Sequence, residues 1–66
     1  MTLLDLKTLA ETARPKAANK AALAQWCTDT LAAHPNDAEV ADLVADVKAA
    51  KDGAAVVAVL DEVKAK

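Results

Sequence analysis

Two copies of one apolar pattern lie in residues 36–66, and they constrain the fold more than any other feature of the sequence. Each copy has apolar residues at i, i+3, i+4 and i+7, the spacing that places side chains on one face of an α-helix. The copies are Val40, Leu43, Val44 and Val47, then Val56, Val59, Leu60 and Val63. Between them, we expect Gly53 to end the first helix in a left-handed conformation and Asp52 to cap the second. The pattern predicts an antiparallel helical hairpin.

A further helix is predicted at the start of the chain. Thr2 and Asp5 have the spacing of a capping box, in which side chain and backbone at a helix start bond to each other. The apolar residues that follow share one face: Leu3, Leu6, Leu9, Ala10 and Ala13. Pro15 disfavours the helical conformation in Arg14, so this helix should end around residue 13.

The segment at residues 15–18 has two interpretations. Pro15 could be the first residue of a new helix, or the segment could be an extended loop that Asn19 closes as a helix cap. We favour the cap. The helix that follows carries the most complete apolar stripe of the chain: Leu23, Trp26, Cys27, Thr30, Leu31 and His34.

The fold class predicted from these signals is all-α, a compact bundle of four short helices. The close variant is a three-helix bundle plus a short extra helix. Asn36 and Glu39 have capping-box spacing before the third helix. The expected helices cover approximately residues 3–13, 20–33, 37–51 and 54–65 of a single helical domain, 1–66. We expect the hairpin to pack on the helix that carries Trp26, and the first helix to close the remaining side.

Composition agrees with this prediction and limits the function. The chain has 66 residues, of which 18 are Ala, the best helix former. Such a short chain buries only about 60% of its unfolded surface, so its stability margin is thin. The net charge of −2 argues against general binding to nucleic acid or anionic membranes. With no signal peptide or membrane span in the sequence, we expect a cytoplasmic, intracellular protein, and its short alanine-rich form suits a bacterial or phage accessory protein.

The residues that could carry catalysis are too few and too far apart. Cys27 and His34 are the only Cys and His, and seven residues of helix separate them by about 10 Å. That exceeds hydrogen-bond reach, and one Cys with one His cannot build a zinc site. Asp42 and Asp46, at i and i+4, are more simply read as a solvated helix face. We expect no enzyme, with no catalytic, metal or cofactor-binding residue.

Three apolar residues are candidates for a partner surface. Trp26 is the largest apolar side chain and is interpreted chiefly as a core anchor, with a partly exposed contact for a partner as the alternative. Leu3 and Val57 could extend an exposed apolar patch. The leading functional hypothesis is a non-catalytic protein–protein interaction module: an accessory, adaptor, inhibitor or assembly component that binds a protein partner or a second copy of itself.

The alternative hypothesis is a weak nucleic-acid-binding module in the N-terminal half. Residues 6–11, the loop through Arg14-Pro15-Lys16, and residues 20–23 together resemble the helix, extended loop, helix layout of SAP-like motifs, which bind DNA or RNA through basic residues around the loop. The resemblance implies phosphate contacts from Lys7, Arg14, Lys16 and Lys20. The chain is acidic overall, so this hypothesis comes second.

Overall fold

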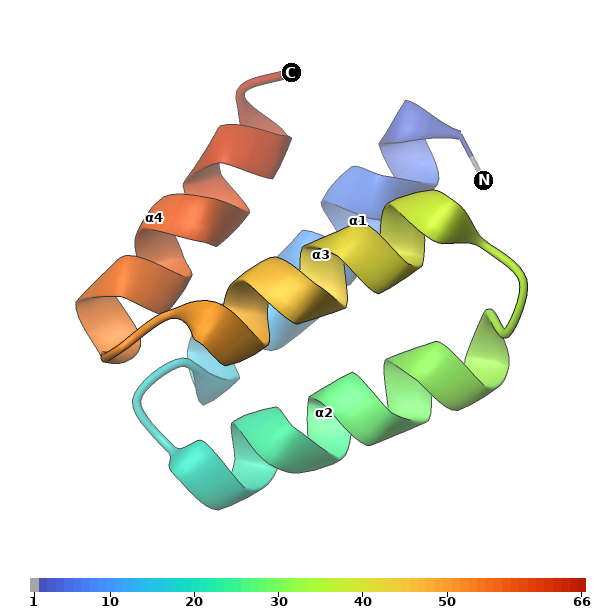
Figure 1. The fold of residues 1–66 in the computed structure, drawn as a ribbon. Coiled ribbons are helices and arrows are strands. Elements are labelled where there is room, and N and C mark those ends of the chain that lie inside the picture. Colours follow the sequence, from blue (N-terminus) through green and yellow to red (C-terminus); the bar gives the residue numbers. More distant parts are fainter. Residues whose placement is uncertain (1) are drawn as a thin grey trace.

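The computed structural model describes residues 2–66, and within them the chain is an all-α bundle of four short helices (Figure 1). The helices lie close to the predicted ranges. They are α1 (Leu3–Ala13), α2 (Lys20–Ala33), α3 (Ala38–Ala49) and α4 (Gly53–Lys64), with one short 3₁₀-helix, η1 (Arg14–Lys16), between the first two.

Three of the predicted caps are confirmed. At the start of α1, the Asp5 backbone N–H donates to Thr2 Oγ1 at 3.2 Å, and the Thr2 N–H donates to Asp5 Oδ2 at 3.4 Å. Asn19 caps α2 by accepting from the Ala22 N–H at 3.1 Å. Asp52 accepts from the Ala55 N–H at 2.8 Å and caps α4. Each cap satisfies a helix-start N–H that has no partner within its own helix.

Two predictions about the hairpin were wrong in detail. The cap of α3 is Asp37, whose carboxylate accepts from the N–H groups of Glu39 and Val40, whereas the prediction placed it at Asn36. Gly53 does not end α3 in a left-handed conformation; its φ is not positive, and it is the first residue of α4. The chain leaves α3 through Ala50, which is extended, with φ −64° and ψ 132°.

The connection between α1 and α2 also differs from the expected extended loop. The α-helix ends at Ala13 as predicted, but Arg14 stays helical, with φ −55° and ψ −48°. The Ala17 N–H donates to the Arg14 carbonyl at 3.2 Å and the Asn19 N–H to the Lys16 carbonyl at 3.0 Å. These local bonds outweigh the preference against α conformation before proline, so the segment is a tight 3₁₀ turn.

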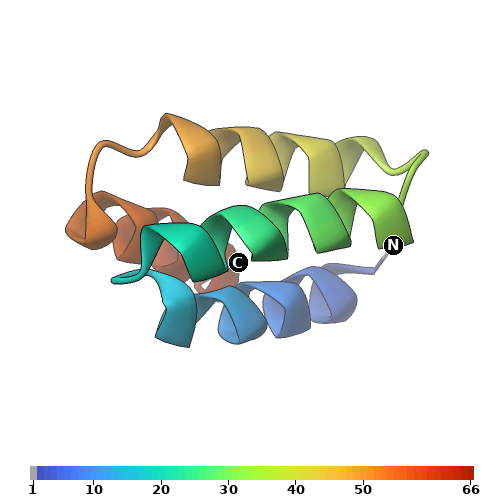
Figure 2. The same cartoon turned by 90° about the horizontal axis from the view of Figure 1, so that it is seen from below.

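The helices pack as two neighbouring pairs. α2 and α3 run antiparallel side by side, and α1 packs against α4 (Figures 1 and 2). Only α3 of the predicted hairpin therefore packs extensively on the helix that carries Trp26, because α4 takes α1 as its main neighbour.

The core follows the predicted stripes. All four stripe residues of α3 are buried, as are three of the four in α4, with Val59 half-buried. Ala10 and Ala13 of α1 are fully buried, and their short side chains let the helices approach closely. The buried apolar residues are Leu6, Ala10, Ala13, Ala17, Trp26, Cys27, Val40, Leu43, Val44, Val47, Val56, Leu60 and Val63.

Candidate functional site

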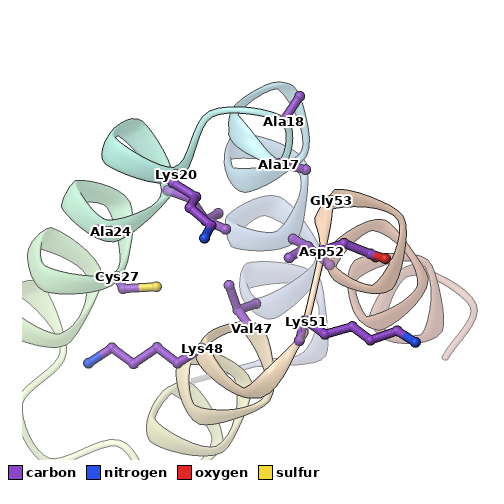
Figure 3. A pocket seen from close by; sticks show the side chains of 13 residues that line it. Ala17, Ala18, Lys20, Ala24, Cys27, Val47, Lys48, Lys51, Asp52 and Gly53 are labelled. Carbon is purple, nitrogen blue, oxygen red and sulfur yellow. The ribbon is translucent and has the colours of Figure 1, made fainter.

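A hollow lies where the start of α2, the end of α3 and the start of α4 meet (Figure 3). Its volume is about 700 Å³, within the range of roughly 300–1,000 Å³ that is usual for ligand sites. We call it the α2–α3 groove. Its lining residues are Ala17, Ala18, Lys20, Leu23, Ala24, Cys27, Val47, Lys48, Ala50, Lys51, Asp52, Gly53 and Val56.

The walls of the α2–α3 groove are apolar because core residues continue into it. Cys27, Val47 and Val56 are each at most 3% exposed, and Leu23 is half-buried. In Figure 3, Cys27 points from α2 into the space between α2 and α3. The remaining apolar positions are alanines, whose side chains end at Cβ and leave the space between the helix ends unfilled. An apolar side chain from outside could occupy this space.

A contact between two backbone segments closes one end of the groove. Gly53 lies against the turn before α2, where a Cβ on Gly53 would be 3.1 Å from the Ala17 carbonyl oxygen and 3.7 Å from Ala18 Cα. The missing side chain is what allows the start of α4 to approach this turn so closely. Gly53 therefore matters for the shape of the groove through close approach and not through a special φ.

Lysines surround the groove. Lys20 comes from the first turn of α2, Lys48 from the last turn of α3, and Lys51 from the connection to α4. The acid among the lining residues is Asp52, and its Oδ1 already accepts the N–H of Ala55. In the part of the chain that the structure describes, none of these three ammonium groups takes part in an ion pair.

Cys27 contributes a thiol, a potential nucleophile, to the lining of the groove. Burial raises the pKa of this thiol above its ordinary value of 9.0, and the nearby Lys48 ammonium partly offsets that increase. The thiol is therefore protonated at neutral pH, and a protonated thiol is a poor nucleophile and metal ligand. His34, the other residue considered for catalysis, lies at the opposite end of α2 and lines a different hollow.

That second hollow has a volume of about 520 Å³ and is lined by Asp5, Thr8, Leu9, His34 and Asp37. Its carboxylates are engaged at helix starts: Asp5 in the capping box of α1, and Asp37 in the cap of α3. Within residues 2–66, no group of three or more His, Cys, Asp or Glu side chains is arranged to hold a metal ion. Asp42 and Asp46 are both exposed on α3.

The three predicted partner-surface residues do not form one surface. Trp26 is only 4% exposed, and its Nε1–H donates to Thr12 Oγ1 at 2.9 Å, so it belongs to the core and not to a partner surface. Val57 is half-buried and packs against the core. Leu3 is 42% exposed, and its neighbour Leu4, which was not among the predicted residues, is 73% exposed. None of these residues lines the α2–α3 groove.

The four candidate nucleic-acid contacts are divided among three elements. Lys7 lies on α1, Arg14 and Lys16 on η1, and Lys20 at the start of α2, where it lines the groove. Arg14 Nη1 pairs with Asp61 Oδ1 of α4. Close by, Lys64 Nζ lies 3.7 Å from Glu11 Oε1 and links α4 to α1. The arginine that the SAP-like resemblance assigned to phosphate thus faces a carboxylate of its own chain.

Sequence reasoning missed Lys48, Lys51 and Ala24 as site residues. In the sequence, Lys48 and Lys51 are basic residues near the end of the third helix, where cations are favourable for the helix dipole alone. The signal that could have found them is the coincidence of alanines and lysines at helix ends: Ala17, Ala18 and Lys20, then Lys48, Ala50 and Lys51.

No known family model, curated protein or solved structure matches this chain. Among the helices of residues 2–66, none combines the length and apolar character needed to cross a membrane.

Proposed function

We propose that this protein is a non-catalytic protein–protein interaction module that binds a segment of a partner protein in the α2–α3 groove. The observation that carries the proposal is the groove itself, an apolar hollow of about 700 Å³ between helix ends. An apolar side chain that leaves water for such a hollow gains roughly 25 cal/mol for each Å² of apolar surface that is buried.

The chemistry of the lining residues favours binding over catalysis. A nucleophile needs a base within hydrogen-bond reach, and the raised pKa of Cys27 keeps its thiol neutral. Within residues 2–66, Lys20, Lys48 and Lys51 form no ion pair with a carboxylate that could act with them as an acid–base pair. We include a cytoplasmic location in the proposal, because a buried cysteine that remains a free thiol is usual in reducing compartments.

The alanines of the groove support a helical or extended partner segment. Ala24 is exposed on α2 and lines the groove, so a partner backbone could approach α2 closely there. Contacts around the groove would have to enlarge the interface toward the roughly 800 Å² per partner that is typical of stable complexes.

The test uses the substitution Ala24→Glu, which places a longer charged side chain in the groove, with Ala41→Glu as the matched control. Ala41 is exposed on α3 and does not line the groove. Immobilised wild-type chain should retain a specific partner from an extract of the source cells, and Ala41→Glu should retain it equally. Ala24→Glu should lose it while circular dichroism shows unchanged helicity. Retention of the partner by Ala24→Glu at wild-type affinity would refute the groove as the binding site.

A further inference from the structure

We infer that the partner segment is acidic as well as apolar: it places an apolar side chain in the α2–α3 groove and carboxylates against Lys20 and Lys48. This inference rests on the proposed function and adds the chemistry of the partner. It depends on the net charge around the groove, which is opposite in sign to the net charge of the remaining residues.

The charge balance can be counted from the lining residues. Lys20, Lys48 and Lys51 contribute +3 and Asp52 contributes −1, which gives +2 at the groove. The whole chain has a net charge of −2, so the remaining residues sum to −4. The net charge of the remaining residues favours a basic partner elsewhere on the molecule, whereas the net charge at the groove repels a basic segment and attracts an acidic one. Charge complementarity of this kind sets the orientation of docking as well as the association rate.

The lysines are available for this contact. None of the three is in an ion pair within residues 2–66. This contrasts with Arg14 and Lys64, which pair with Asp61 and Glu11. The ammonium groups of the three groove lysines would therefore exchange only water for a partner carboxylate, without first breaking an ion pair inside the protein.

The positions of the two lysines define what the segment must look like. Lys20 lies on the α2 side of the groove and Lys48 at the end of α3, with Cys27 and Val47 between the two helices (Figure 3). An apolar residue flanked by acids, as on an amphipathic helix with Leu beside Glu, would pack against the apolar walls and place carboxylates near the lysines. A nucleic acid matches this arrangement less well, because its phosphates would face the lysines while the apolar walls stayed exposed to water.

The experiment compares two synthetic amphipathic helices that share one leucine face and carry either glutamates or lysines on the other face. Each is fluorescently labelled and titrated with the full chain at low salt, while amide spectra of the ¹⁵N-labelled chain report the site. The acidic peptide should bind at least about tenfold more tightly than the basic one, shift the amides of Ala24, Cys27 and Gly53, and weaken as salt increases. Lys48→Glu should abolish the preference, and Lys7→Glu, the same charge change on α1 outside the groove, should preserve it.

The other outcomes separate the two proposals. Equal binding of both peptides at the groove amides would overturn the acidic preference and leave the groove as an interaction site. Failure of both peptides to bind would overturn the inference and the proposed groove together. Self-association in sedimentation experiments that Lys48→Glu abolishes would assign the groove to a second copy of the chain. Tighter binding of duplex DNA than of the acidic peptide, again lost in Lys48→Glu, would assign it to nucleic acid; either result overturns the inference.

Discussion

The indole of Trp26 and the hydroxyl of Thr12 connect α2 to α1 through a hydrogen bond of 2.9 Å from Nε1 to Oγ1. The same hydroxyl donates to the Leu9 carbonyl at 2.7 Å, so the oxygen of Thr12 is donor and acceptor at once. Trp26 is only 4% exposed, and this bond gives its N–H a partner where little water reaches. The bond therefore explains how the one large aromatic side chain can be buried in so small a core.

Thr12→Val should destabilise the protein by about 1 kcal/mol, because it keeps the shape of the side chain but leaves the indole N–H without its acceptor. The matched control is Thr8→Val, which removes a hydroxyl from the same helix that bonds only to the Leu4 carbonyl. Urea unfolding of the three proteins, followed by tryptophan fluorescence, measures the difference. Thr12→Ser should recover most of the loss, and equal stability of the two valine variants would contradict the prediction.

Gly53→Ala should also destabilise the protein, by about 0.5 kcal/mol, despite the better helix propensity of alanine. The new Cβ would lie 3.1 Å from the Ala17 carbonyl oxygen. Hydrogen bonds on both sides of that carbonyl, from the Ala17 and Asn19 N–H groups, prevent the turn from moving freely. Thermal unfolding monitored by circular dichroism shows whether Gly53→Ala lowers or raises the stability.

Ala54→Gly is the control for Gly53→Ala, because Ala54 is the next residue of α4 and is exposed. It measures the loss of stability that a glycine causes at this helix start, at a position without the close contact to the Ala17 carbonyl. If Gly53→Ala stabilised the protein by as much as Ala54→Gly destabilised it, the close approach to Ala17 would have no energetic weight.

The stability of the protein should decrease at alkaline pH because of Cys27. Its thiol has a pKa raised by burial above 9.0, with Lys48 lowering it in part. The folded state therefore holds the thiol proton more tightly than the unfolded state does. The stability is fully present below pH 9.0 and is lost as the pH rises through the folded-state pKa. The urea midpoints of wild type and Cys27→Ala should change with pH in the same way up to pH 9.0. Above pH 9.0, the wild-type midpoint should decrease more steeply than that of Cys27→Ala.

Titration with DNA should leave the amide spectrum of this chain unchanged at physiological salt. Arg14 is paired with Asp61, and the other SAP-like candidates, Lys7, Lys16 and Lys20, are distributed over three elements. The measurement is a two-dimensional amide spectrum with short single- and double-stranded DNA. Movement of peaks from residues 14–25 that is reversed by added salt would instead support the nucleic-acid hypothesis.

The helices could be predicted from the sequence because their signals are local. Apolar spacing within three or four residues and caps such as Asn19 and Asp52 depend only on neighbours along the chain. The errors arose where a local rule had two solutions. Asn36 and Asp37 are both good caps, and Arg14 stayed helical because the bonds of the 3₁₀ turn outweighed the effect of Pro15.

The α2–α3 groove could not be predicted in the same way. Lys20 and Lys48 are 28 positions apart in the sequence, and only the packing of α2 along α3 brings them to one hollow. The pairing of α1 with α4 was missed for the same reason, since the stripes show which face is buried and not which helix covers it. Cys27 lies on the predicted apolar stripe and is buried, but its position beside a hollow depends on alanines elsewhere in the fold.

The cap of α3 offers a direct test of Asp37 against Asn36. The Asp37 carboxylate accepts from the N–H groups of Glu39 at 3.0 Å and Val40 at 3.3 Å. Asp37→Ala should therefore lower the thermal midpoint, whereas Asn36→Ala, one residue earlier and exposed, should leave it nearly unchanged. Equal loss in both variants would contradict the assignment of the cap.

The contribution of Asp37 to stability should also depend on pH in the acidic range. Although desolvation raises the pKa of Asp37, the hydrogen bonds from Val40 and Glu39, with other attractive interactions, bring it below its ordinary value of 3.8. The folded state thus favours the charged carboxylate, and the resulting stability is present above pH 3.8 and disappears as the pH falls through the lower folded-state pKa. Asp37→Asn retains a capping side chain without the charge. Its thermal midpoint should lie below that of wild type near neutral pH, and the two midpoints should converge as the solution is acidified.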